Sequence, residues 1–328
     1  MLSYVIKRLL YMIPTLIVIS MVAFIVIQLP PGDYLDTLVA TLESQGESVS
    51  HEAIRALQDR YGLGQPIYVQ YWKWISGILF RGDFGQSFTW NKPVSELIWD
   101  RLFLTFVLSL ASLVFVWIVA FPVGIYSAVK QYSMGDYIAT FLGFLGLATP
   151  NFMIALILMY LAFKLFNQSV GGLFSPEYID AAWSWGRVVD LLAHLWIPVI
   201  IIGTAGTAGL IRIMRANLLD ELKKPYVTTA RAKGVSEAKL LFKYPVRTAL
   251  NPFVSTVGWV LPELVSGAAI VAIVLSLPTT GPLLLRALLS QDMYLAGSFI
   301  MMLSTLTVVG TLVSDLLLAW LDPRIRLE

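Results

Sequence analysis

The sequence LFLTFVLSLASLVFVWIVAFPVGIYSAV occupies residues 102–129, and none of its side chains is charged. An α-helix rises about 1.5 Å per residue, so roughly 20 apolar residues cross the hydrocarbon core of a bilayer, which is about 30 Å thick. This stretch is long enough to cross, and it predicts a transmembrane helix over Leu102–Val129. The chain is therefore expected to be a membrane protein.

Five other stretches on either side of this run have the same apolar character, so the chain is predicted to be an all-α, polytopic membrane protein with about six spans. The other spans are expected at Leu9–Leu29, Tyr137–Phe166, Leu191–Met214, Pro252–Leu277 and Ala296–Leu321. Composition agrees, because 57% of the 328 residues are hydrophobic and only 13% are charged, a surface that a soluble domain could not solvate. Pro150 lies in the middle of a span and predicts a kink there.

Orientation follows from the basic residues, which are enriched on the cytoplasmic side of membrane proteins. With an even number of spans, both termini share a side. That side also carries the turn at 130–136 and the segment at 215–250, where Lys and Arg outnumber Asp and Glu, whereas acidic residues are in excess on the opposite side. Both termini are therefore predicted to be cytoplasmic.

Three parts organise the chain. Residues 1–29 form the N-terminus and the first span, which is read as an uncleaved anchor because no small-residue cleavage site follows it. Residues 30–101 form an extracytoplasmic (periplasmic) segment, and residues 102–328 form the core transmembrane domain with an inner loop at 215–250.

The extracytoplasmic segment carries two amphipathic helical patterns. Ser50 is expected to be the N-cap of a helix over His51–Tyr61. In the next helix, apolar residues recur at helical spacing and predict one apolar stripe, formed by Tyr68, Trp72, Ile75 and Leu79. The segment is expected to be a helical cap on the membrane face, which alternatively also helps to seat an extracytoplasmic binding protein.

The inner segment is the most informative part of the sequence, and residues 215–247 read RANLLDELKKPYVTTARAKGVSEAKLLFKYPVR. Pro225 is expected to begin a short helix, Gly234 to end it, and Ser236 to cap a second helix. The residues Val235, Ala238, Phe242 and Val246 would share one face of that second arm. A slender helix–Gly–helix with basic flanks suits insertion into the groove of a partner protein, and it equally suits contact with anionic lipid.

Several kinds of chemistry are disfavoured by the residues that the chain lacks. It has no cysteine, its net charge of +2 does not indicate nucleic acid binding, and no Gly is followed by Lys, as a phosphate-binding P-loop requires. His51-Glu52 begins a zinc motif, but Arg55 occupies the position of its second His. The run from Gly203 to Gly209 has small residues every third position, which predicts close helix packing. No catalytic, cofactor or metal site is therefore expected.

Acidic residues within the predicted spans are limited to Glu263 and Asp315. Such residues are costly and suggest function, and Glu263 is the better candidate for lining a pathway, together with Asn151 beside the predicted kink. At the outer end of the fourth span, Asp190 and His194 predict a local hydrogen bond. An ion-coupled transporter usually has paired charges and internal repeats, and an intramembrane hydrolase needs facing catalytic groups. Neither pattern is apparent.

The motif Thr228-Thr-Ala-Arg-Ala-Lys-Gly234 resembles the cytoplasmic coupling-loop motif of ABC importer permeases, in the version found in the dipeptide/oligopeptide/nickel transport family. The long outer segment also matches that family, as do Gly82–Ser87, which resembles its G-D-x-G-x-S element, and Leu321–Arg326, which resembles its L-D-P-R-x-R ending. Two departures are visible. Thr228 and Thr229 stand where the general motif has Glu and Ala, and Ala272 and Pro278-Thr279 replace the family's usual Glu and Pro-Gly pair.

The resemblance implies a type I ABC importer permease fold in a bacterial inner membrane. It implies that Thr228, Thr229, Ala230, Arg231, Ala232, Lys233 and Gly234 couple the chain to an ATPase. It further implies a second, homologous permease that forms a heterodimer with this chain, and contact with membrane lipid. Two cytoplasmic ATPase subunits that bind ATP and Mg and an extracytoplasmic solute-binding protein complete the implied partners. Peptides are the expected cargo, with oligosaccharides, opine-like compounds and nickel complexes as alternatives.

Overall fold

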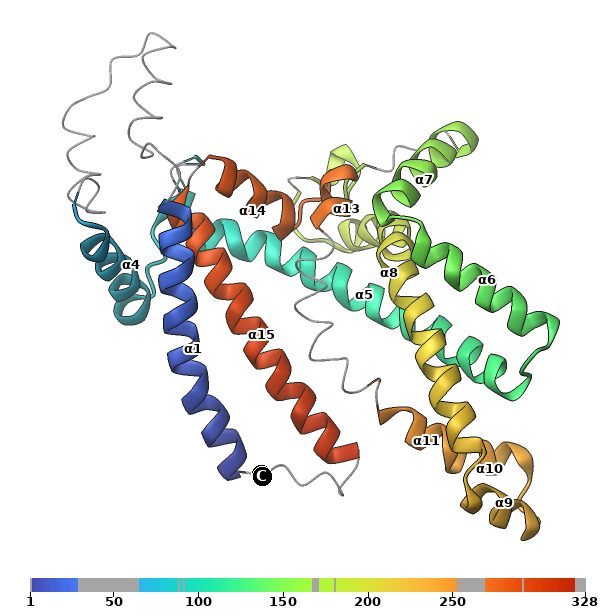
Figure 1. Cartoon of the computed structure of the whole chain (residues 1–328). Helices are drawn as coiled ribbons and strands as arrows, with labels where there is room; N and C mark the ends of the chain where they lie inside the picture. The colour runs from blue at the N-terminus through green and yellow to red at the C-terminus, as the bar shows by residue number, and fades with distance from the viewer. Residues whose placement is uncertain are drawn as a thin grey trace. The chain divides into compact units, whose positions relative to one another are not determined.

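The computed structural model describes residues 2–28, 65–87, 89–90, 92–166, 171–179, 181–251, 253, 269–290 and 292–321. In this part of the chain the structure is helical apart from one two-stranded hairpin (Figure 1). The chain divides into two compact units, of which the first comprises Met1–Phe103 and Thr279–Val308 and the second Leu104–Pro278 and Val309–Glu328.

The first unit is built from α1 (Leu2–Gln28), α4 (Ile67–Arg81), the hairpin of β1 (Gln86–Ser87) and β2 (Lys92–Pro93), the start of α5 (Val94–Val129), α14 (Thr280–Leu289) and the first part of α15 (Met293–Leu321). Aromatic residues fill its core. The ring of Phe24 stacks on Trp74 with centroids 5.5 Å apart, and the hydroxyls of Ser20 and Tyr71 lie 2.8 Å apart and share a hydrogen bond.

The apolar stripe predicted for α4 is not the face that packs. Of the four predicted residues only Ile75 packs against the core, half-buried; Tyr68, Trp72 and Leu79 are exposed, whereas Trp74 is buried. A β-carbon added to Gly297 of α15 would lie 3.1 Å from the Trp74 ring, so α4 and α15 approach closely there. The prediction was wrong because α4 is apolar on more than one face, and the fit of Trp74 against Gly297 selects the buried one.

The spanning helices agree with a polytopic membrane protein. Among the described residues, α5, α8 (Trp185–Leu222) and the Tyr294–Val313 part of α15 are each long and apolar enough to cross a bilayer. A bent pair, α6 (Met134–Ala148) and α7 (Asn151–Phe166), adds a fourth span if the pair is counted as one. The predicted first span lies in α1 as far as Gln28, and Leu29 lies outside the described residues, as does most of the predicted fifth span, Pro252–Leu277.

The kink predicted at Pro150 is a complete break. The axes of α6 and α7 differ by 101° at this point, and Thr149 between them is extended, with φ −90° and ψ 119°. Proline lacks a backbone N–H and clashes with the preceding turn, and the residue before it avoids helical geometry. The Leu145 carbonyl accepts both the backbone amide of Thr149 at 3.0 Å and its hydroxyl at 2.8 Å, and these bonds close the last turn of α6.

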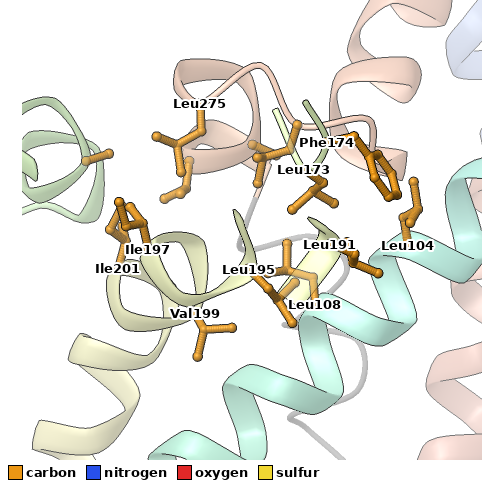
Figure 2. Packing of buried hydrophobic residues seen from close by; sticks show 14 of the residues in the cluster. Leu104, Leu108, Leu173, Phe174, Leu191, Leu195, Ile197, Val199, Ile201 and Leu275 are labelled. Carbon is orange, nitrogen blue, oxygen red and sulfur yellow. The ribbon is translucent and has the colours of Figure 1, made fainter. Parts of the chain in front are cut away.

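The core of the second unit lies where α5 and α8 meet. Figure 2 shows leucine side chains of both helices and of the 171–179 segment in one apolar cluster. A β-carbon on Gly203 would lie 2.6 Å from the Phe115 ring, and one on Gly206 would lie 3.6 Å from Val116. Close packing through the small residues of this run is therefore confirmed at these two positions. At Gly209 no atom lies within 4 Å of the added carbon.

The segment before α8 is fixed to that helix by polar contacts. Asp190 accepts hydrogen bonds from the backbone and the hydroxyl of Ser175 at 2.8 and 2.7 Å. His194 Nδ1 lies 2.8 Å from the Asp190 carbonyl oxygen, which confirms the predicted local hydrogen bond. The guanidinium of Arg187 lies over the rings of Phe174 and Trp183.

Candidate functional site

The candidate site lies at one end of α8, where α9 (Pro225–Ala232), α10 (Glu237–Lys243) and α11 (Pro245–Ala249) follow in sequence (Figure 1). Helix α8 continues to Leu222, two turns beyond the predicted end of the span at Met214. Its extension is supported by Arg215, whose guanidinium donates two hydrogen bonds of 2.9 Å to the carboxylate of Asp136 in α6. The loop is therefore shorter and more rigidly held than the sequence suggested.

A buried carboxylate holds the turn between α8 and α9. Glu221, the last acidic residue of α8, is 8% exposed. It accepts a hydrogen bond of 2.6 Å from the hydroxyl of Tyr226 and forms a salt bridge with Lys224. Burial, together with the bond to Glu221, raises the pKa of Tyr226 to about 12. Pro225 occupies the first turn of α9 as predicted, where a missing N–H costs nothing.

Helix α9 presents short side chains to its surroundings. Val227 is fully buried and anchors the helix. Of the seven residues expected to couple to a partner, Ala230 is half-buried, and the others are exposed: Thr228, Thr229, Arg231, Ala232, Lys233 and Gly234. The exposed surface of α9 is thus formed by small or polar residues, and another protein could approach its backbone closely.

Gly234 ends α9 in the left-handed conformation, with φ +77°. The amide of Val235 donates to the carbonyl of Ala230 at 3.3 Å, and the amide of Gly234 donates to the carbonyl of Arg231 at 3.0 Å. This pair of bonds is the Schellman arrangement, which requires a positive φ at the position of Gly234. The helix end predicted at Gly234 is confirmed.

An ion pair that sequence reasoning missed links the two arms of the loop. Arg231 Nε donates to Glu237 Oε1 at 2.5 Å, and Nη2 donates to Oε2 at 3.0 Å. The hydrogen bonds raise the pKa of Arg231 and lower that of Glu237. The only available signal was two opposite charges on either side of Gly234, since a separation of six residues is not a helical pairing. Arg231 is therefore paired within the loop, although its side chain is still 54% exposed.

The second arm differs from the predicted one. Ser236 takes the N-cap position of α10, but its side chain makes no capping hydrogen bond. Leu240 is buried, whereas Phe242 is 62% exposed. Val246, predicted to share a face with Phe242, is buried in the next helix instead. The two residues separate because α10 ends at Lys243 and the chain changes direction before Pro245.

Apolar packing connects this arm to the spanning helices. Val246 and Ala249 of α11 lie in one buried cluster with Met214 and Leu218 of α8. The ring of Phe253 packs on that of Phe121 in α5, with centroids 4.8 Å apart. A displacement of the loop would therefore act on α8 and α5 directly, because packed interiors transmit strain.

The two predicted pathway residues are placed differently. Asn151 is half-buried at the first position of α7, directly after the break at Pro150. Glu263 lies outside the described residues. Within the part of the chain that the structure describes, no three His, Cys, Asp or Glu side chains are grouped so that they could hold a metal ion.

Comparison with known proteins identifies the family of the chain. Residues 120–327 match the family described as binding-protein-dependent transport system inner membrane component, and residues 1–111 match the N-terminal region of such membrane components. The chain is 36% identical over 328 residues to the oligopeptide transport system permease protein AppB of Bacillus subtilis, an alignment that covers 99% of this chain and all of that protein.

Other relatives align over similar lengths. The dipeptide transport system permease protein DppB of Alkalihalophilus pseudofirmus is 32% identical, with 99% of this chain and 100% of that protein covered. The glutathione transport system permease protein GsiC of Salmonella typhimurium is 31% identical, with 99% of each chain covered. The chain therefore belongs to the family of inner membrane components of binding-protein-dependent transport systems, and it is a permease subunit of an ABC-type importer.

Proposed function

We propose that this permease subunit forms half of a translocation pathway for peptides and that Thr228–Gly234 dock on a cytoplasmic ATPase subunit. The observation that carries the proposal is α9, whose exposed face has small or polar side chains while Val227 and the Glu221–Tyr226 bond fix it to the end of α8. Such a helix can enter a groove and pass a displacement to the spans.

The proposed complex contains a second, similar permease subunit, which makes a heterodimer with this chain. Two ATPase subunits bind ATP and Mg, no cofactor is held by this chain, and an extracytoplasmic binding protein delivers the cargo. The chain lies in the inner membrane among lipids with both termini in the cytoplasm. Closure of the ATPases then moves the coupling loops and switches the spans between inward-open and outward-open states.

A peptide cargo is supported by the names of the relatives, which are oligopeptide, dipeptide and glutathione permeases. Calorimetric titration of the partner binding protein with short peptides should give saturable binding. Binding of an oligosaccharide, an opine-like compound or a nickel complex in place of peptides would replace this assignment and leave the transporter type unchanged.

Pathway residues are proposed at Asn151 and Glu263. Helices broken at membrane depth are found where backbone lines a cavity or is buried in protein, and Asn151 begins α7 directly after such a break. Glu263→Gln and Asn151→Ala should each change the rate of uptake while the complex still assembles. Normal uptake by either variant, or loss of assembly, would return that residue to a structural role.

The docking proposal can be tested by crosslinking, because the chain contains no native cysteine. Ala232→Cys places a thiol on the exposed side of α9, and Gln131→Cys places a matched exposed thiol in the turn before α6. With a short heterobifunctional reagent that carries one maleimide and one photoreactive group, Ala232→Cys should crosslink to the ATPase subunit, and Gln131→Cys should not. Equal yields from both positions, or none from Ala232→Cys, would contradict docking at α9.

A further inference from the structure

The Gly82–Ser87 element forms a compact turn that leads from α4 into the β1–β2 hairpin. Gly82 and Gly85 both have positive φ angles, of +62° and +86°. The carboxylate of Asp83 accepts the amide of Gly85 at 2.8 Å, and the carbonyl of Gly85 accepts the amide of Val94 at 3.0 Å, where α5 begins. The element thus fixes the chain path into the second span.

One buried carboxylate fastens this hairpin to the connection between α14 and α15. Ser87 and Asp292 are both fully buried, and the Ser87 hydroxyl donates to Asp292 Oδ2 at 2.5 Å. The amide of Thr89 donates to the same oxygen at 3.3 Å. Asp292 Oδ1 accepts the amide of Leu295 at 3.2 Å and so caps α15, and the Asp292 amide donates to the Ala287 carbonyl at 2.9 Å at the end of α14.

Close packing surrounds this bond. A β-carbon on Gly85 would lie 2.6 Å from the ring of Tyr294 in α15, so only glycine permits this approach. At the rim, the hydroxyl of Thr89 donates to that of Ser290 at 2.9 Å. The contact joins residues about two hundred positions apart, and none of its members belongs to the coupling site.

We propose that Ser87 and Asp292 are positioning residues of the transport cycle, which keep the hairpin and the α14–α15 connection joined in every state. Separating them would leave a buried carboxylate without its hydroxyl donor, which is costly unless water or another donor replaces it. The packing of Tyr294 on Gly85 leaves little room for an alternative arrangement. The pathway would then open elsewhere, and this part of the first unit would move as one body. The proposal rests on the proposed transport function.

The test uses a disulfide at the rim of the contact. Thr89→Cys/Ser290→Cys replaces two hydroxyls that lie within hydrogen-bonding distance, and this chain has no native cysteine with which either thiol could pair. The oxidised complex should take up solute within about twofold of the reduced complex. The two single-cysteine variants, treated identically, are the controls. Uptake that stops on oxidation and returns with reductant would show that the contact opens during the cycle and would overturn the proposal.

A second readout needs no uptake. The yield of the disulfide should be the same in the nucleotide-free and the ATP-bound complex, and a tenfold fall in either state would contradict a permanent contact. This measurement tests the permanent contact alone. The proposed docking function is tested separately, by the crosslink from Ala232→Cys.

Restoring uptake to a Ser87 variant with the disulfide distinguishes a positioning role of the Ser87–Asp292 bond from the capping of α15 by Asp292. Ser87→Ala removes the hydroxyl donor but leaves the cap of α15 by Asp292 intact. We expect Ser87→Ala to lower uptake severalfold and the Thr89→Cys/Ser290→Cys disulfide to restore it to within about twofold of the parent, because the covalent bond replaces the lost one. A disulfide that forms in the Ser87→Ala background without restoring uptake would overturn the positioning role.

Discussion

At the scale of single residues, the coupling loop depends on one backbone conformation and one ion pair. Gly234 has open space around it, since no atom lies within 4 Å of an added β-carbon, yet its φ of +77° disfavours ordinary side chains. Any penalty for substitution there is conformational rather than steric. Arg231 and Glu237 then link α9 to α10 by two hydrogen bonds.

The ion pair can be tested by exchanging its charges. Arg231→Glu places two carboxylates side by side and should weaken co-purification of the ATPase subunit, because repulsion changes the angle between the two arms. The exchanged variant Arg231→Glu/Glu237→Arg should recover most of it. Both partners are exposed, so the defect of the single variant should shrink at high salt. An exchanged variant that behaves no better than Arg231→Glu would indicate that Arg231 contacts the partner directly.

Local chemistry made part of this site predictable from sequence. Pro225 at the start of α9 and Gly234 at its end follow rules that involve only neighbouring residues, and both were correctly predicted. The Arg231–Glu237 pair and the Ser87–Asp292 bond were not, because each depends on how separate elements meet in space.

At the scale of elements, the interior of the second unit depends on where small residues fall along α8. The helix brings Gly203 against Phe115, while Gly209 in the same helix has no neighbour within 4 Å of an added β-carbon. Sequence periodicity predicted close packing for the whole run, but it could not tell which glycines were covered. The same limit explains α4, where two apolar faces compete and tertiary packing selects the one that contains Trp74.

The two glycines of α8 provide a matched pair of substitutions. Gly203→Ala forces a methyl group to within 2.6 Å of Phe115 and should destabilise the protein by about 1–3 kcal/mol through overpacking. The methyl group added by Gly209→Ala has no atom within 4 Å. This substitution should stabilise the helix by up to about 1 kcal/mol, because alanine restricts the unfolded backbone. Thermal unfolding of the purified variants would check both signs, and equal effects at the two positions would contradict the packing of α8 on α5.

The break between α6 and α7 gives a functional prediction at the same scale. Pro150→Ala restores a backbone N–H and removes the ring that opposes helix continuation, so it should favour a straighter span. We expect uptake to fall several-fold while the complex still assembles. Unchanged uptake would indicate that the 101° bend is held by packing and not by the proline.

At the scale of the whole molecule, apolar run lengths and basic residues made the membrane class and a topology predictable. The order of helices follows the predicted spans wherever the structure describes them, and the additional length of α8 carries the chain directly into the coupling loop. The lengths of the apolar segments predict the spans because the thickness of a bilayer fixes the number of residues needed to cross it. These lengths do not indicate which of the spanning helices are broken.

Sidedness can be tested with single cysteines in the naturally cysteine-free chain. In intact cells a membrane-impermeant maleimide should label Thr89→Cys, which lies in the predicted extracytoplasmic segment. It should label Ala232→Cys only after the membrane is permeabilised. Labelling of both from outside would contradict the topology. Fusion of reporters at Gly46 and Gly234 gives an independent assignment of the same two sides.

The central claim is that α9 transmits ATPase movement to the spans, and substitution at Gly234 tests it most directly. Valine tolerates a φ of +77° badly, whereas asparagine adopts the left-handed region several-fold more often than most residues. In reconstituted complexes, solute-stimulated ATP hydrolysis and uptake should be lost in Gly234→Val and largely kept in Gly234→Asn, with both variants inserted in the membrane at parental levels. Full stimulated hydrolysis and uptake in Gly234→Val would contradict the account.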